Sequence, residues 1–218
     1  MNLTILYDNC ALDGFNSGWA FSCLLESCGK TLLFDTAWDS YRLIENMRRL
    51  GIGLDDIDAI FISHNHWDHV GSLAYLLNMM DEIPVFVPSS FPKHLKGEIG
   101  KRAKLVEIKD ACEIMEGFHS TGGLGSDIME QSLVVKAEKG NVVVCGCSHP
   151  GVERILERAR TFGEVYGIVG GLHDFNNLEA LGGLKLIIPC HCTQKKSELM
   201  GMYPDICKEG KAGAVFEL

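Results

Sequence analysis

Three histidines and one aspartate lie within the six-residue segment HNHWDH, at positions 64–69. His64 and His66 are two residues apart, so both side chains lie on the same side of an extended segment. Asp68 continues this alternation, and His69 follows where a helix is expected to begin. Imidazoles and carboxylates bind divalent ions such as zinc, and they suit iron or manganese equally well. The spacing indicates two ligands for one metal ion and two for a second ion nearby.

The same four residues have a simpler interpretation as capping and surface groups where a strand meets a helix. Asp68 is a suitable N-cap residue, and a single histidine usually needs no special role. Capping does not explain four such groups directly after the apolar run at positions 59–62. The metal-binding interpretation is therefore favoured.

Further histidines also follow predicted strands. The segments VVVCGCS, VYGIVGGL and LKLIIPC lead to His149, His173 and His191, as AIFIS leads to His64. Loops at the strand ends of α/β proteins are common places for chemistry. We therefore expect these histidines to converge on one edge of a β-core.

The remaining pattern predicts the elements that position these groups. Strands are expected for LTILYD, AFSCLLES, KTLLFDTA and PVFVPS, and a hairpin for SLVVKAEKGNVVVCGC. Helical spacing is found at positions 40–50, 70–80 and 152–161, near 176–181, and from about 194. Positions 89–127 give the weakest pattern, with mixed charge and only short strand-like pieces such as KLVEI.

Composition restricts the classes of function. The 218 residues, with 46% hydrophobic and 22% charged residues, are ordinary for a globular protein. A net charge of -9 disfavours nucleic acid as the main partner, because phosphate binding needs clustered lysine and arginine. No export signal is visible, and the apolar runs are shorter than the roughly 20 residues of a membrane-spanning helix. We expect a cytoplasmic protein that binds a small molecule, with no nucleic-acid or membrane partner; its oligomeric state is not predicted.

The nine cysteines are expected to be reduced, because no export signal is visible and an odd number cannot pair completely. Cys145/Cys147 and Cys190/Cys192 have one intervening residue, unlike the two or more of a zinc knuckle. Packing is the favoured role for Cys145 and Cys190.

The segment HNHWDH resembles the His-x-His-x-Asp-His signature of the metallo-β-lactamase superfamily. LLFDTA is similar to the early strand of that family, and CGCSHPG, GGLHDF and PCHC resemble a branch of metal-dependent hydrolases. That branch includes archaeal dihydropterin/ribofuranosylaminobenzene-phosphate synthase-like proteins. The resemblance covers about positions 3–193. It implies an α/β fold, an αββα sandwich of two mixed β-sheets flanked by helices, with residues 1–218 forming one domain.

The resemblance also implies a ligand set for two metal ions. The first ion would be held by His64, His66 and His149, and the second by Asp68, His69 and His191. Among the other histidines, His119 is a weaker rival for the place of His149, and His94 is expected to be solvated. His173 is predicted as a catalytic residue together with Asp68, while a metal ligand or a packed core residue stays open for it. Asp35 is expected to fix a ligand or its loop.

The sequence departs from the family pattern at Cys147. Many members carry a bridging acidic residue at about this place, whereas here no carboxylate follows until Glu153. A thiolate can bridge metals, yet a strand cysteine more often packs. The role of Cys147 and the number of bound ions, one or two, therefore stay open.

The ligand set predicts a metal-dependent hydrolase that contains zinc, with iron or manganese as alternatives. A metal-bound hydroxide would attack an ester, lactone or phosphoester of a small molecule, which carries a phosphate or a strained acyl bond. The first alternative is a pterin-condensing transferase. For this function Trp19, Trp38 and Trp67, with Phe15, would line a pocket for a flat ligand. The segment 89–127, however, looks short for covering such a substrate. The second alternative is a non-hydrolytic di-iron redox protein.

Overall fold

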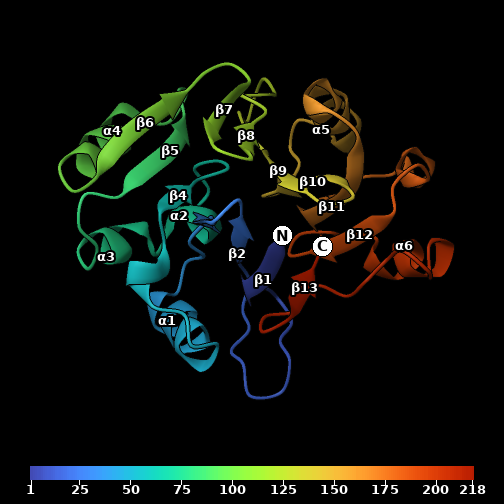
Figure 1. The fold of residues 1–218 in the computed structure, drawn as a ribbon, viewed down its shortest axis with the longest axis horizontal. Helices are drawn as coiled ribbons and strands as arrows, with labels where there is room; N and C mark the ends of the chain where they lie inside the picture. The colour runs from blue at the N-terminus through green and yellow to red at the C-terminus, as the bar shows by residue number, and fades with distance from the viewer.

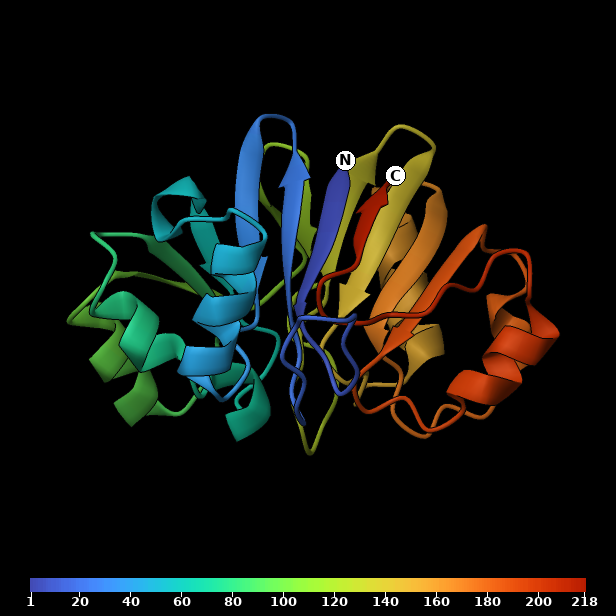
Figure 2. The same ribbon diagram turned by 90° about the horizontal axis from the view of Figure 1, so that it is seen from below.

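The computed structural model describes residues 1–218 and has four layers: helices, a β-sheet, a second β-sheet and helices (Figures 1 and 2). The two sheets face each other in the middle of the molecule, and Figure 2 shows the helices on the two outer sides. The predicted αββα sandwich of two mixed sheets is confirmed.

The first sheet has seven strands in the order β13-β1-β2-β3-β4-β5-β6. Their bounds are Asn2–Tyr7 (β1), Ser22–Ser27 (β2), Lys30–Phe34 (β3), Ala59–Phe61 (β4), Pro84–Pro88 (β5), Lys104–Ile108 (β6) and Val215–Glu217 (β13). The strands from β13 to β3 pair antiparallel, and those from β3 to β6 pair parallel. The sheet is therefore mixed, with its parallel half next to the segment HNHWDH.

The second sheet has six strands in the order β12-β11-β10-β9-β8-β7. Their bounds are Cys112–Met115 (β7), Phe118–Ser120 (β8), Leu133–Ala137 (β9), Gly140–Cys145 (β10), Val165–Gly171 (β11) and Leu186–Cys190 (β12). The strands β10, β11 and β12 are parallel, so their carboxyl ends lie at the same edge of the sheet. The segments that carry His149, His173 and His191 follow these three ends.

The helices cover the outer faces of the sheets. The helices beside the first sheet are Ser40–Arg49 (α1), Leu73–Leu77 (α3) and Lys93–Gly100 (α4), and those beside the second are Val152–Ala159 (α5) and Lys196–Met202 (α6) (Figure 1). A short helix, Trp67–Val70 (α2), lies in the site loop, and there are 3-10 turns at Leu54–Asp56, Arg160–Phe162 and Leu178–Leu181. None of the helices has the length and the apolar character that crossing a membrane requires.

The hydrophobic residues form three layers of core. One cluster fills the space between the sheets and includes Phe34 and Phe61 from the first sheet and Phe118 and Val144 from the second. The other two clusters lie under the outer helices of each sheet. Alternating strand residues supply the inner and outer clusters, which is the period-two pattern expected of strands buried on both faces.

Several elements differ from the sequence-based expectation. The helix predicted at 70–80 is shorter in the structure, where α3 covers Leu73–Leu77 and the separate helix α2 ends at Val70. Gly71 between them packs so closely that a Cβ atom there would lie 2.6 Å from Trp38 Cα. Helix α4 was not predicted, since its weak apolar pattern is interrupted by Gly97. Strand β13 was also not predicted, because its pairing partner β1 lies at the other end of the chain.

Candidate metal centre

The loop after β4 is held by Asp35, which follows β3. Asp35 Oδ1 accepts a hydrogen bond from the Ser63 backbone N–H at 2.7 Å, and Oδ2 accepts one from Ser63 Oγ at 2.7 Å. Asp35 Oδ2 also lies 2.6 Å from Nδ1 of His69. The carboxyl group thus joins the beginning and the end of the histidine-rich loop, as expected for a residue that fixes a ligand.

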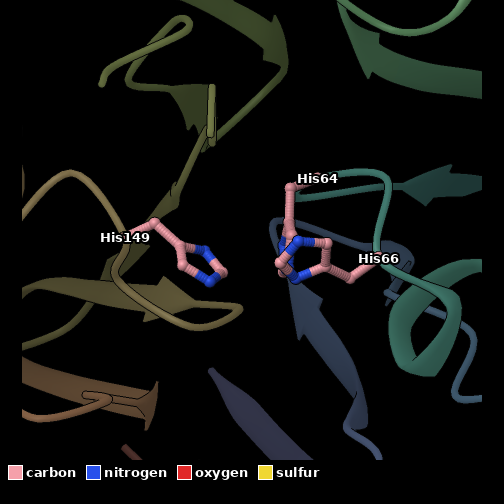
Figure 3. Close-up of side chains that lie close together, drawn as sticks. All are labelled: His64, His66 and His149. Atoms are coloured by element: carbon pink, nitrogen blue, oxygen red, sulfur yellow. The ribbon is translucent and has the colours of Figure 1, made fainter. Parts of the chain in front are cut away.

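The first group of converging side chains consists of His64, His66 and His149. Their ring centroids are 4.5 Å (His64–His66), 4.7 Å (His64–His149) and 4.9 Å (His66–His149) apart. One nitrogen of each ring lies within 4.8 Å of those of the other two. Figure 3 shows His149 approaching from the second sheet and the other two from the loop after β4. Both sheets therefore contribute to this group.

The second group consists of Asp68, His69 and His191, whose ligand atoms also lie within 4.8 Å of one another. Nε2 of His191 is 3.3 Å from Oδ2 of Asp68, and Nε2 of His69 is 4.0 Å from Oδ1. His191 follows β12 in the left-handed region, with φ 44°, and its backbone N–H donates to Asp8 at the end of β1. The second group thus also joins the two sheets.

Each of four imidazoles is held by its Nδ1 atom. The partners and distances are Ser63 Oγ for His64 (2.9 Å), Asp35 Oδ2 for His69 (2.6 Å), Glu130 Oε2 for His149 (2.8 Å) and Asn9 Oδ1 for His191 (3.1 Å). The Nε2 atoms of His64 and His191 are buried and make no hydrogen bond, although Oδ2 of Asp68 lies 3.3 Å from that of His191. Buried polar atoms are rarely left unpaired, and metal-ligating histidines usually bond a protein group through the other ring nitrogen. The donor set therefore fits divalent metal ions.

Glu130 is a site residue that the sequence analysis missed. Its Oε1 accepts the backbone N–H groups of Gly146, Cys147 and Ser148 at 2.9–3.1 Å, and Oε2 accepts that of His149 at 3.0 Å. The family pattern predicts a carboxylate after β10, whereas Glu130 lies just before β9. Because β9 and β10 form a hairpin, an acidic residue next to the first strand lies beside the end of the second.

Comparison with known proteins agrees with this arrangement. Residues 20–190 match the family model of the metallo-beta-lactamase superfamily. The chain belongs to the metallo-β-lactamase superfamily. Superfamily membership implies divalent metal binding and supports a metal-dependent hydrolase at the level of the family.

Relatives within the superfamily carry different activities in their names. The 7,8-dihydropterin-6-methyl-4-(β-D-ribofuranosyl)-aminobenzene-5′-phosphate synthase of Methanocaldococcus jannaschii is 30% identical, over 87% of each chain. The structure of Tm1679, a metal-dependent hydrolase of the β-lactamase superfamily, has a TM-score of 0.83 and 25% identity, and covers 100% of this chain and 99% of that one. YhfI of Bacillus subtilis, at 14% identity and a TM-score of 0.74 over 100% of this chain and 99% of its own, shows the fold alone. The predicted resemblance to the superfamily and to its archaeal synthase branch is confirmed.

The pKa values of the side chains in the candidate metal centre depend mainly on burial. Burial lowers the pKa values of His64 and His69 to about 3, and the charge of the neighbouring histidines acts in the same direction. Burial raises the pKa of Asp35 to about 7. Burial also acts to raise the pKa of Glu130, but the hydrogen bond with His149 and nearby positive charge outweigh it, so that this pKa lies below its usual range. The imidazoles of His64 and His69 are therefore neutral near pH 7, which is the state that binds a metal ion.

The other histidines lie outside the two ligand groups. His173 follows β11, its side chain is 44% exposed, and its ring centroid is 5.4 Å from that of His149. It is therefore at the rim of the site and does not pack in the core. His119 lies on β8 with its ring 4.7 Å from that of Phe162, and His94 is exposed on α4. Neither belongs to a group of converging metal-binding atoms.

Three tryptophans surround the second ligand group without being buried. Trp19 is 54% exposed, and its ring centroid is 5.0 Å from that of His191. Trp38 and Trp67 are also exposed and meet edge to face at 5.6 Å, with Trp67 next to Asp68 in the chain. Exposed indoles beside a polar centre offer faces on which a flat ligand can stack.

Proposed function

We propose that the chain is a metal-dependent hydrolase of a small molecule, acting on an ester, lactone or phosphoester. The observation that carries the proposal is the convergence of histidines that are fixed through Nδ1, of which His64 and His191 have buried Nε2 atoms without a hydrogen bond. His64, His66 and His149 would hold one ion, and Asp68, His69 and His191 a second. The resident metal is proposed to be zinc, which suits this mixture of imidazole and carboxylate ligands.

When bound, such ions make a water molecule ionise near neutral pH and polarise the oxygen of the group under attack. The residues of the chain supply the positioning. Asp35 and Glu130 hold the rings of His69 and His149 in one orientation. Asp68, whose side chain is buried beside His191 with 9% of it exposed, is proposed to orient the attacking water by accepting its hydrogen bond.

His173 is proposed to contact the substrate. Its exposed ring lies beside His149, and its Nδ1 is 3.2 Å from Oδ1 of Asp174. A ring held in this way can donate a proton to a departing oxygen or bind a phosphate. The acidic net charge of -9 supports a small-molecule substrate in preference to nucleic acid. We also propose that the protein acts in the cytoplasm, which fits nine free cysteines.

The direct test is the paired measurement of metal content and hydrolysis over a panel of esters, lactones and phosphoesters. The metal-loaded protein should hydrolyse at least one class, and chelation should abolish the activity. His66→Ala should lose both metal and activity, whereas His94→Ala, altered at an exposed histidine on α4, should keep both. A folded His66→Ala variant with full activity would remove the basis of the proposal.

A second candidate function is a pterin-condensing transferase. Two observations favour it: the exposed indoles of Trp19, Trp38 and Trp67 beside the centre, and the 30% identity to the archaeal synthase. The test incubates the metal-loaded protein with a pterin diphosphate and the aminobenzene riboside phosphate. A coupled product that depends on metal would favour the transferase over the hydrolase, and absence of coupling would dismiss it.

A further inference from the structure

Cys147 lies in the middle of the metal centre. It follows β10, its backbone N–H is held by Glu130 at 2.9 Å, and only 4% of the residue is exposed. Its Sγ is 3.3 Å from Nε2 of His69, on the side of the ring that faces the centre. The thiol therefore points among the proposed ligands, whereas the side chain of Cys145, two residues earlier, belongs to the outer core under the helices.

The sulfur of Cys147 lies close to residues of both ligand groups. Its Sγ lies within 4.8 Å of the ligand atoms of His64 and His69, and it also lies within 4.8 Å of those of His191 and Cys192. His64 belongs to the first ligand group and His191 to the second. The sulfur is thus close to both groups, as a bridging ligand must be.

A second observation points to a ligand in the same space. The Nε2 atoms of His64 and His191 are buried and make no hydrogen bond, although Oδ2 of Asp68 lies 3.3 Å from that of His191. Each of these two rings shares a group of converging atoms with Cys147, and His69 belongs to the group of His64. A cation bonded to the sulfur and to these nitrogens would satisfy both of them.

We propose that Sγ of Cys147 is a metal ligand that bridges the two ions, in the place of the carboxylate of other superfamily members. On binding, the S–H proton leaves to the solvent and the sulfur forms a bond to each ion, with no change of oxidation state. This inference rests on the metal centre of the proposed function. It also specifies the metal, because a thiolate favours zinc, cobalt or iron over magnesium, calcium and manganese.

Cys192 provides a matched control. It is almost as buried as Cys147, and its Sγ lies 3.8 Å from the carbonyl oxygen of Cys147 and close to Gly171. It shares a group of converging atoms with Cys147 and His191, but none with His64 or His69, so it is not close to the first ligand group. Cys192→Ser therefore removes a neighbouring sulfur without removing the proposed bridge.

The experiment titrates the metal-free full-length protein with Co²⁺ and records the near-ultraviolet absorption of the thiolate-to-cobalt charge transfer. We expect this band in the unmodified protein and in Cys192→Ser, and its loss in Cys147→Ser. The affinity for the second ion should fall about tenfold or more in Cys147→Ser. Cys147→Asp, which places a carboxylate at the proposed bridge, should bind both ions without the band. It tests the same prediction if Cys147→Ser fails to fold.

The outcomes separate this inference from the proposed function. Three outcomes would overturn the role of Cys147 and leave the metal centre standing. The unmodified protein takes up cobalt without a charge-transfer band, the band persists in Cys147→Ser or Cys147→Asp, or the band is lost only in Cys192→Ser. Failure of the unmodified protein to take up cobalt or zinc at all would overturn both. Loss of the band in both Cys147 variants, with retention in Cys192→Ser, would establish the sulfur as a ligand.

Discussion

Three imidazoles of the proposed metal centre, those of His69, His149 and His191, are oriented by acceptors from distant parts of the chain. Asp35 follows β3, Glu130 precedes β9 and Asn9 follows β1. An imidazole that is fixed at Nδ1 can present only Nε2 to the centre. The geometry of the proposed ligands therefore depends on residues that would not touch a bound metal ion.

Glu130→Gln tests this dependence at the residue scale. The amide keeps the size of the side chain but loses the charge and one acceptor oxygen, while four backbone N–H groups and the ring of His149 need acceptors. We expect a loss of about 1–3 kcal/mol in the free energy of unfolding and a loss of about 10- to 100-fold in metal affinity. Denaturant titration and competition with a chromophoric chelator measure the two effects.

The exposed Glu153 provides the control for this variant. Glu153→Gln should change neither quantity by more than about 0.5 kcal/mol. Equal effects of the two substitutions would contradict the supporting role of Glu130.

The pH dependence of stability follows from the buried ionisable groups in the metal-free protein. His64 and His69, with pKa values lowered from 6.5 to about 3, contribute stability above pH 6.5 that is lost as the pH falls towards 3. Asp35, with a pKa raised from 3.8 to about 7, acts in the opposite direction, since its contribution is present below pH 3.8 and is lost as the pH rises to 7. Between about pH 4.5 and 5.5 these three groups therefore make the unfolded chain bind about one more proton than the folded chain.

We expect the unfolding free energy of the chelated protein to increase by about 1.4 kcal/mol for each pH unit in this window. Denaturant titrations at several pH values between these limits measure the slope. The slope should be unchanged in His94→Gln, where an exposed ring is lost. A flat or falling profile would show that the imidazoles are protonated in the folded state.

At the scale of elements, the centre is formed where short loops leave the carboxyl ends of parallel strands. The loop after β4 and the loop after β10 meet at Gly146, where a Cβ atom would overlap with Ser63 and lie 3.1 Å from His64 Nδ1. This close approach lets Ser63 contact both Asp35 and His64. The absence of a side chain at Gly146 therefore sets the spacing of the two loops.

Gly146→Ala should force the two loops apart and lower the metal affinity about tenfold or more. Isothermal titration of the metal-free protein with Zn²⁺ measures the change. Gly183→Ala is the matched control, because a Cβ atom there would meet nothing within 4 Å. Unchanged affinity in Gly146→Ala would mean that the loops can separate without disturbing the ligands.

The local sequence pattern predicted the strands and the histidines that follow them, but it did not predict the long-range contacts that hold these histidines in place. The cluster at positions 64–69 and the histidines after β10, β11 and β12 were found because each follows an apolar strand directly. Glu130 and strand β13 were not found, because their partners are distant in the sequence and no local period marks them. The position of Cys147 between the two ligand groups likewise depends on the meeting of two sheets.

At the scale of the whole molecule, the two sheets share one core. Phe118 of the second sheet is fully buried in the same cluster as Phe34 and Phe61 of the first. All three tryptophans lie before position 70, in the part of the chain that precedes the second sheet. Tryptophan fluorescence therefore reports on the first sheet and its loops.

Phe118→Ala tests whether the sheets unfold together. The substitution should lower the free energy of unfolding by about 3–5 kcal/mol, and the fluorescence and far-ultraviolet circular dichroism transitions should shift by the same amount. Tyr75→Ala, at an exposed position, should leave both within about 0.5 kcal/mol. A fluorescence transition that does not move would show that the first sheet unfolds independently.

The pairing of β1 with β13 and the convergence of candidate ligands from both sheets have a consequence for synthesis of the protein. A ribosome makes the HNHWDH segment long before His149 and His191, and it makes β13 after the other strands of the two sheets. The growing chain therefore carries an incomplete set of candidate ligands throughout most of its translation. The set becomes complete only after the segment with His191 has left the ribosome.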